Sequence, residues 1–450
     1  MTTQQAAAGA EFGTTPAHSA RSAGLRYGAL FGPVVFGVTA AGVALPDVAA
    51  ALHASPAATA WVLTAHALAL GVGTAFFGRL ADTRGLRTAL LLGSLALALG
   101  AAICLLAPDL RVLVVGRFVQ AAGSGGMAAC AMALTASAAP ETRPRVFAGF
   151  GATMAVFSAS ATLAGGVLTE WVTWRIALVL PVLSLLVVPL CLAGARPRKN
   201  SGRPMDLPGA GLLTVTAMSF LILIQSSALA LTGSVNTVTA AVFLLSAAGL
   251  VRRVRTAETS FVPRALVTDG VFLRAAITGI GVYGGLFAAM YAVPQLLVGE
   301  HGWSVLAVGV WLLPGAVVGA VLSRLAGKLT AGDRGHRLLA AVALAFAAAL
   351  AGALAGSGVL LLILGASLGF AAFSVTQVFT TALMSAHIEP ARRGGAMGLL
   401  NLAFFVGGGV GSASAGALAK TMSLGSALGV IALFPLAAAL SSFTLGRRSR

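Results

Sequence analysis

Residues 61–87 read Trp61-Val-Leu-Thr-Ala-His66, then an apolar run to Phe77, then Gly78-Arg-Leu-Ala-Asp82-Thr-Arg84-Gly85-Leu-Arg87. The first part is apolar enough for a membrane helix, which needs roughly 20 such residues. The second part is basic and contains two glycines, and the next apolar run begins directly after it. This stretch therefore predicts two consecutive membrane helices joined by a tight basic loop.

The composition of the whole chain agrees with a membrane protein. Of its 450 residues, 58% are hydrophobic and 9% are charged, whereas a soluble domain carries about 25% charged residues. The formal net charge is +17, but the basic residues lie between apolar runs, which indicates membrane topology rather than nucleic-acid binding. Cys104, Cys130 and Cys191 all fall within apolar runs and suggest neither a disulfide framework nor a metal site. We therefore expect the lipid bilayer as the partner, with no nucleic acid.

Fourteen apolar runs are long enough to cross a membrane, and they predict an all-α membrane protein. Helices are expected because lipid cannot pair free backbone groups, and the alternating pattern of a membrane barrel is missing from the sequence. The predicted spans are 27–49, 60–78, 88–107, 112–135, 146–168, 173–194, 207–228, 236–252, 271–296, 303–325, 337–355, 357–382, 393–418 and 423–444.

The distribution of Lys and Arg gives these spans an orientation. With both termini in the cytoplasm, Arg111, Arg175 and Lys420 fall outside and Arg117 falls within a span, which leaves 25 of the 29 basic residues inside. The positive-inside rule favours this arrangement. We predict a multi-pass protein of the cell (cytoplasmic) membrane with both termini cytoplasmic.

The chain also contains a weak internal repeat. The segment Gly78-Arg-Leu-Ala-Asp82 after the second span is similar to Gly327-Lys-Leu-Thr330, followed by Asp333-Arg-Gly335, after the tenth. A helical unit used twice is typical of transporters, which bind substrate between the repeats. The predicted domains are a disordered cytoplasmic tail (1–26), an N-terminal six-helix bundle (27–194), two inserted transmembrane helices (207–252), a C-terminal six-helix bundle (271–444) and a basic cytoplasmic tail (445–450).

Several of these segments resemble a known family. Gly78-x-Leu80-Ala81-Asp82-x-x-Gly85-x-Arg87 is similar to the signature loop of the major facilitator superfamily. Further segments resemble its fourteen-helix drug/proton antiporters, above all the tetracycline exporters of Gram-positive bacteria, and the resemblance covers nearly all of the chain after residue 27. These segments are Ala44-Leu-Pro46-Asp-Val, Trp61-Val-x-Thr-Ala, Gly71-Val-Gly-Thr-Ala, Arg117-Phe-Val-Gln120, Trp174-Arg175, Pro314-Gly315 and Met397-Gly-Leu-Leu-Asn401.

This resemblance implies a major facilitator fold and a function. The expected function is efflux of small organic molecules, such as antibiotics or metabolites, by alternating access. The proton gradient would supply the energy, and no cofactor is expected. We also expect a monomer.

The resemblance gives the loop after the second span a role as a cytoplasmic latch. We expect Asp82 just before the third helix, where the helix macrodipole favours a carboxylate, and we expect the glycines to allow close helix approach and a sharp turn. The alternative is a basic loop that only sets topology. The latch residues are Gly78, Asp82, Arg84, Gly85 and Arg87.

Arg117 is predicted about six residues into the fourth span, roughly 9 Å deep at 1.5 Å per residue. A charge at that depth is costly and normally faces a cavity or a partner. Gln120 and Ser124 follow at positions i+3 and i+7 and share its helix face. In the resembling family this arginine belongs to a motif linked to proton transfer. We expect Arg117 and Gln120 in the cavity and in proton coupling; the alternative is an arginine that extends to the outer membrane face.

The chain departs from the tetracycline exporters in its membrane carboxylates. Those proteins carry acids within their spans, whereas this chain has small residues such as Ser158 and Gly408 at matching positions, and its twelve Asp and Glu residues fall in tails, loops or span ends. A buried carboxylate is the usual counter-ion for a cationic drug. We therefore expect a neutral or anionic, moderately lipophilic small-molecule substrate. Because Ala161-Thr162 also replaces the Gly-Pro of the antiport motif, an uncoupled or symport-type metabolite transporter of the same fold remains the alternative.

His66 and several side chains of later spans complete the candidate site. Histidine titrates near neutral pH, so His66 can carry the coupling proton; the alternative is a hydrogen-bonded packing residue. A few polar groups among aromatics suit a site for a lipophilic molecule, although each one singly is more often a packing residue. The substrate-cavity candidates are Ser158, Tyr283, Tyr291, Gln295, Trp311, Gln377, Asn401 and Phe405.

The sequence gives no sign of an enzyme. It contains no nucleotide-binding loop, so ATP-driven transport is not expected. A non-transporting membrane sensor would need a signalling domain, and none is predicted. No metal site is predicted either, because the metal-ligating residue types show no ligand spacing.

Overall fold

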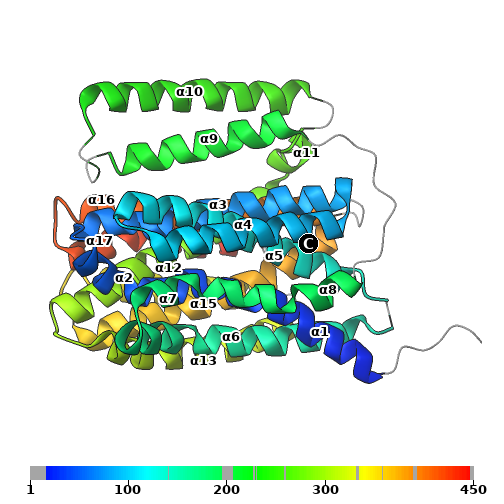
Figure 1. Ribbon diagram of the computed structural model, residues 1–450, viewed down its shortest axis with the longest axis horizontal. Coiled ribbons are helices and arrows are strands. Elements are labelled where there is room, and N and C mark those ends of the chain that lie inside the picture. Colours follow the sequence, from blue (N-terminus) through cyan, green and yellow to red (C-terminus); the bar gives the residue numbers. More distant parts are fainter. Residues whose placement is uncertain are drawn as a thin grey trace, which may run out of the picture.

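The described part of the chain is built from helices. The computed structural model describes residues 17–139, 141–194, 206–226, 229, 231–257, 260–330, 334–356, 358–388 and 393–445. Within these ranges no strand occurs. Figure 1 shows the long helices lying side by side along one common direction, as membrane-spanning helices do.

The N-terminal bundle contains the first six predicted spans. Two of these spans are interrupted by short 3₁₀ segments, each with a proline at its start, because proline lacks the N–H that a continuous α-helix uses. The elements are α1 (Ala17–Phe31), η1 (Gly32–Val35), α2 (Phe36–Ala51), α3 (Pro56–Arg84), α4 (Leu86–Leu106), α5 (Leu110–Ala136), α6 (Arg143–Trp171), α7 (Trp174–Val179), η2 (Leu180–Val187) and α8 (Val188–Gly194).

The remaining helices form an inserted pair and the C-terminal bundle. The inserted pair is α9 (Leu207–Ile224) and α10 (Gly233–Thr256), followed by the short α11 (Arg264–Val267). The C-terminal bundle comprises α12 (Gly270–Gly299), α13 (Val305–Thr330), α14 (Gly335–Gly352), α15 (Val359–His387), α16 (Arg393–Leu418), α17 (Leu424–Ile431) and α18 (Leu433–Leu445).

Within the described residues, the number of candidate membrane helices is one short of the fourteen predicted spans. Among the described residues, 13 helical segments are long and apolar enough to cross a membrane. The apolar part of α13, Val305–Gly319, is shorter, and α13 occupies the position of the tenth predicted span. The all-α membrane fold is therefore confirmed, while the division into domains stays a prediction.

Small residues hold the helices of the N-terminal bundle close together. A Cβ atom added at Gly100 of α4 would lie 2.0 Å from the backbone nitrogen of Gln120, and one added at Gly123 of α5 would lie 2.2 Å from that of Leu97. Such close packing is what joins helices in lipid, where the hydrophobic effect does not. On the outer face of α4, the leucines at 91, 95 and 99 are exposed and suit contact with acyl chains.

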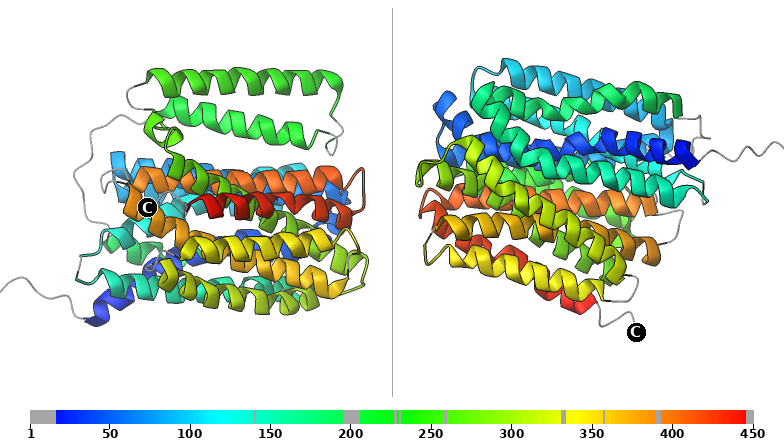
Figure 2. Two further views of the ribbon diagram at one scale, coloured as in Figure 1. Left: turned by 180° about the vertical axis from the view of Figure 1, so that it is seen from behind. Right: turned by 90° about the horizontal axis from the view of Figure 1, so that it is seen from below.

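The inserted pair covers the seam between the two bundles. Ala217 and Leu221 of α9 pack with Trp61 of α3 and Ala413 of α16. α10 packs against α9, with the rings of Phe220 and Phe243 stacked 5.6 Å apart. In Figures 1 and 2 the pair lies outside the two bundles, with α10 outermost.

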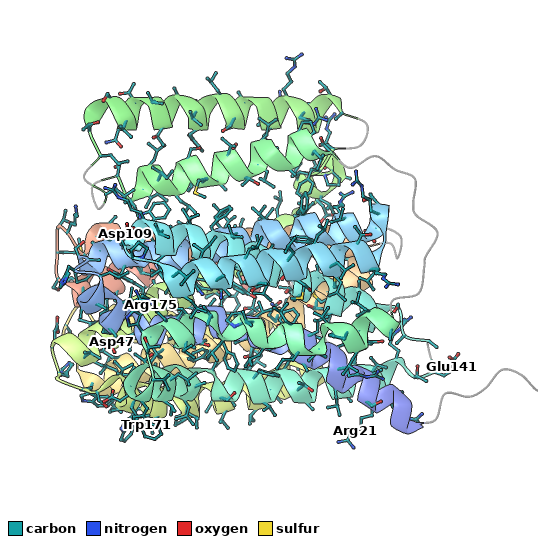
Figure 3. The ribbon with its side chains drawn as sticks, viewed as in Figure 1. Arg21, Asp47, Asp109, Glu141, Trp171 and Arg175 are labelled. Carbon is teal, nitrogen blue, oxygen red and sulfur yellow. The ribbon has the colours of Figure 1, made fainter. Side chains whose placement is uncertain are left out.

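The two ends of the helices differ in charge. Figure 3 shows Asp47, Asp109, Trp171 and Arg175 at one end, which we call the opposite end. The other end, where Figure 3 shows Arg21 and Glu141, also carries the α3–α4 and α5–α6 connections with their arginines, and we call it the basic end. This distribution supports the predicted orientation, in which the basic end faces the cytoplasm.

The two ends of the chain differ from the predicted boundaries or lie outside the described residues. Helix α1 already begins at Ala17, so the prediction of a disordered tail up to residue 26 does not hold for residues 17–26, where the first helix extends outward as a polar, basic segment. Residues 1–16, residues 446–450 of the basic tail and Asp333 of the second motif copy lie outside the described residues.

Candidate functional site

The predicted latch loop is almost entirely helical. α3 continues through Arg84, and Gly85 alone separates it from α4. Gly85 has a φ of +94°, a conformation that favours glycine, and so completes the turn in one residue. Asp82 therefore lies in the last turn of α3, and the expectation that it sits in a loop is wrong.

The other latch residues are placed at the same end. Asp82, Arg84 and Arg87 are exposed at the basic end. A Cβ atom added at Gly78 would meet Ala129 at an ordinary 3.9 Å, so close helix approach does not explain this glycine.

Arg79, inside the same motif, makes contacts that the sequence analysis did not assign. Its Nη2 donates a hydrogen bond to the carbonyl oxygen of Phe261 at 3.3 Å. Its guanidinium also lies 5.9 Å from the centre of the Phe261 ring. A Cβ atom added at Gly395 of α16 would lie 3.6 Å from Nη2. Arg79 thus links α3 to the segment before α11 and to the start of α16.

Arg117 of α5 is completely buried in the N-terminal bundle. Its Nη1 donates to Oε1 of Gln120 at 2.8 Å and to the carbonyl oxygen of Leu178 at 2.9 Å, and its Nη2 donates to the carbonyl oxygen of Gly37. Gln120 donates from Nε2 to the same Leu178 oxygen at 3.1 Å. Among the described residues no carboxylate forms an ion pair with Arg117, and its Nε has no hydrogen-bond partner. Backbone carbonyls and one amide therefore hold a buried positive charge.

His66 of α3 lies beside this arginine. The side chain is completely buried, and neither ring nitrogen has a hydrogen-bond partner. A Cβ atom added at Gly37 would lie 2.3 Å from Cε1 and 2.5 Å from Nε2 of His66. Gly37 thus contacts the His66 ring while its carbonyl oxygen accepts from Arg117. The structure brings His66, Arg117 and Gln120 together around one glycine.

An aromatic cluster lies in the C-terminal bundle and reaches the N-terminal one. The Tyr283 ring of α12 has the rings of Phe373, Phe404 and Phe405 at 5.0, 5.1 and 5.3 Å, measured between centres. Phe405 of α16 also faces α3, because a Cβ atom added at Gly71 would lie 3.0 Å from its Cβ.

Two further candidates lie close to this cluster. Gln377 of α15 is beside the Tyr283 hydroxyl, although that hydroxyl makes no full hydrogen bond. Asn401, four residues before Phe405, lies one turn away on the same face of α16. The structure therefore brings four of the eight cavity candidates together at the junction of the bundles.

The other four cavity candidates lie elsewhere. The Tyr291 hydroxyl donates to the carbonyl oxygen of Pro56 at 2.7 Å, and Gln295 donates to the Tyr291 carbonyl oxygen at 2.9 Å. Ser158 is half-buried on α6. Trp311 is 56% exposed and lies 6.0 Å from the ring of Trp303 on the surface of α13.

The bundles touch each other near the opposite end. A Cβ atom added at Gly42 of α2 would lie 2.7 Å from the carbonyl oxygen of Met290. A Cβ atom added at Gly309 of α13 would lie 2.5 Å from the carbonyl oxygen of Thr162 on α6. Together with the bond from Tyr291 to the Pro56 carbonyl, these contacts join the two bundles on this side.

An apolar groove of about 280 Å³ lies on another side of α3, between this helix, α4 and α5. All of its lining side chains are apolar, among them Val72, Phe76 and Phe118. The sequence analysis named none of them, because an apolar groove facing lipid has the same residue types as any lipid-facing surface.

Two helical bundles, a buried arginine in one and an aromatic cluster at their junction define a multi-pass membrane protein of the transporter class. The model of the Major Facilitator Superfamily matches residues 28–412. The chain belongs to this superfamily, whose members are membrane transporters rather than enzymes.

Three relatives carry the names of antibiotic resistance or export proteins. The puromycin resistance protein of Streptomyces alboniger is 31% identical over 71% of this chain and 64% of its own length. The cephamycin export protein of Amycolatopsis lactamdurans is 38% identical over 40% of this chain and 38% of its own length. The lincomycin resistance protein of Streptomyces lincolnensis is 32% identical over 40% of this chain and 38% of its own length. The matched region thus spans less than two thirds of each relative.

A solved structure supports the fold. The crystal structure of an auto-inhibited POT family peptide transporter has a TM-score of 0.64 and covers 96% of this chain and 97% of its own, at 16% identity. At this identity the similarity shows the fold alone. The particular likeness to tetracycline exporters stays a prediction.

Proposed function

We propose that this chain exports small organic molecules of the antibiotic or secondary-metabolite class across the cell membrane. The observation that carries the proposal is the aromatic cluster around Tyr283, which lies in the C-terminal bundle and packs through Phe405 against α3 of the N-terminal bundle. A site shared by both bundles can be exposed to one side and then to the other. The names of the relatives support export of antibiotics.

The proposed substrate is neutral or anionic and moderately lipophilic. Rings such as Tyr283 and Phe405 supply apolar contact, and Gln377 and Asn401 supply polar groups. The fixed charge of the N-terminal bundle is the positive Arg117, and no carboxylate of the described residues accompanies it. A cationic drug would therefore lack a buried counter-ion in this part of the protein.

Proton coupling is the proposed source of energy, with His66, Arg117 and Gln120 as the coupling group. His66 has two buried ring nitrogens without partners, so a proton taken up there would change the charge beside Arg117. The N-terminal bundle would rock against the C-terminal bundle, and the basic-end residues Gly78, Asp82, Arg84, Gly85 and Arg87 would latch the cytoplasmic gate. The protein would act as a monomer.

One observation favours an uncoupled or symport-type transporter instead. The described membrane core holds Arg117 with backbone carbonyls rather than with an acid that could carry protons. Transport with and without an imposed pH gradient separates the two functions.

The test is a susceptibility panel in a host that lacks its own efflux pumps. The panel contains puromycin, lincomycin, a cephamycin and, as a lipophilic cation, ethidium. The proposal expects raised resistance to at least one neutral or anionic compound and loss of this resistance in Arg117→Ala. Resistance to ethidium that Arg117→Ala leaves unchanged would contradict the proposed substrate class.

A further inference from the structure

Asp206 is the meeting point of three chain segments at the basic end. It caps α9 by accepting the Gly209 N–H at 3.0 Å and accepts the Phe261 N–H at 2.7 Å. Nε of Arg253, near the end of α10, lies 2.5 Å from Oδ1 and forms an ion pair. The Asp206 side chain is only 4% exposed.

Phe261 continues this connection into the N-terminal bundle. While its N–H donates to Asp206, its carbonyl oxygen accepts from Arg79 of α3, and its ring lies under the same guanidinium. Arg79 belongs to the motif that contains the proposed latch residues. A short chain of contacts thus runs from Arg253 through Asp206 and Phe261 to Arg79.

The inserted pair also contacts both bundles through α9. A Cβ atom added at Gly409 of α16 would lie 3.3 Å from Cδ1 of Leu221. Leu221 also packs with Trp61 of α3. Those contacts are apolar and allow sliding. The connection through Asp206 is polar and directional, and it ties the basic end of the pair to Arg79 of α3 through Phe261.

We infer that Asp206 is a positioning residue for transport. It holds the inserted pair and the Phe261 segment against Arg79, so that the pair moves with α3 when the bundles rock. The inference rests on the proposed transport function, but the position of the pair can be measured without any flux. Charge-assisted hydrogen bonds to a nearly buried carboxylate are the strongest polar contacts available for such a task.

The variants separate this role from helix capping. Asparagine is as good an N-cap as aspartate, so Asp206→Asn keeps the cap on Gly209 while it removes the ion pair and one acceptor. Asp109→Ala is the matched control, because Asp109 caps α5 at the opposite end and accepts only neighbouring N–H groups among the described contacts. Arg253→Lys preserves the charge opposite Asp206 and serves as the conservative variant.

Spin labels measure where the pair lies. One cysteine pair, Leu91→Cys on α4 and Val251→Cys on α10, reports on the basic end. A second pair, Val115→Cys on α5 and Val235→Cys on α10, reports on the opposite end. All four positions are between 45% and 57% exposed, whereas the native Cys104, Cys130 and Cys191 are buried.

We expect Asp206→Asn to lengthen and broaden the basic-end distances while the opposite-end distances keep their wild-type values. Turnover should fall about tenfold, with KM changed by less than about twofold, because a charge-assisted contact is lost outside the substrate site. Arg253→Lys and Asp109→Ala should resemble the wild type in both measurements. Unchanged basic-end distances in Asp206→Asn would overturn the inference, as would altered distances with wild-type turnover. A wild-type protein without flux would count against the proposed function, and the distances alone would then decide the role of Asp206.

Discussion

Arg117 donates a hydrogen bond to the carbonyl oxygen of Gly37, across the N-terminal bundle from α5 to α2. The ring of His66 packs on the same glycine from α3. Three helices therefore meet at one residue without a side chain, and both basic groups contact it.

Replacing Gly37 by alanine should disturb both groups. The new Cβ would lie 2.3 Å from His66 Cε1, so the ring or α2 must move, and overpacking of this kind costs about 1–3 kcal/mol. We expect a lower melting temperature in detergent and loss of transport. Gly151→Ala is the control, because nothing lies within 4 Å of its added Cβ. Equal melting temperatures for the two variants would contradict the tight packing at Gly37.

Removing the Arg117 side chain should strongly reduce transport. In Arg117→Ala the Leu178 carbonyl keeps Gln120 as a side-chain donor, and the Gly37 carbonyl loses its side-chain donor. Transport should fall at least about tenfold, since hydrogen bonds from charged groups contribute about 1.5–3 kcal/mol. Flux into proteoliposomes measures this, with the exposed Arg111→Ala as a control. Retained flux in Arg117→Ala would exclude Arg117 from the transport cycle.

Much of this site could be predicted from the sequence, and the missing parts have a physical reason. The spacing of Arg117 and Gln120 placed both on one helix face, and the structure joins them by a hydrogen bond. Their other partners, the carbonyl oxygens of Gly37 and Leu178, are backbone atoms of distant residues, which no side-chain pattern marks.

The latch region shows the same limit. A basic, glycine-containing segment is typical of a loop, but here Gly85 is the single residue that separates α3 from α4. The contact from Arg79 to Phe261 joins residues that are 182 positions apart, so local pattern could not reveal it.

Trp311 shows a different limit. Aromatic side chains suit both cavities and lipid-facing surfaces, so the residue type alone does not predict that Trp311 is exposed on α13.

The Tyr291 hydroxyl should help to close the opposite end. Tyr291→Phe removes its hydrogen bond to the Pro56 carbonyl, which costs about 1 kcal/mol. Hydrogen exchange in the segment 52–58 should become faster because that end opens more often. Tyr283→Phe is the matched control, since its hydroxyl makes no full hydrogen bond, and it should leave exchange there unchanged. Equal exchange in both variants would show that Tyr291 does not hold this end closed.

Acid should weaken the junction at Asp206. Burial by itself would raise the pKa of this carboxyl, but hydrogen bonds from Gly209, Phe261 and Arg253 outweigh that effect and lower the pKa below its ordinary value. The carboxylate therefore stabilises the fold fully above the ordinary Asp value of about 3.9, and this contribution disappears as the pH falls through the lower folded-state pKa.

A thermal unfolding series between about pH 7 and pH 3 measures this dependence. The melting temperature of the wild type should fall below about pH 4, and the fall should be smaller in Asp206→Asn, which cannot lose that charge. Asp269, whose pKa is also lowered by its hydrogen bonds despite burial, remains in both proteins. It therefore contributes equally to the pH dependence of both melting temperatures. Identical pH profiles for the wild type and Asp206→Asn would contradict a lowered pKa at Asp206.

Proton-coupled export that depends on His66 and Arg117 can be measured as flux across a vesicle membrane. The protein is reconstituted with the compound to which it gives the greatest resistance, and flux is followed with and without an imposed pH gradient. We predict that the gradient drives uphill transport in the wild type and that His66→Gln retains only gradient-independent flux down the substrate's own gradient. Uphill transport that survives in His66→Gln, or wild-type flux that does not respond to the pH gradient, would exclude proton coupling through His66.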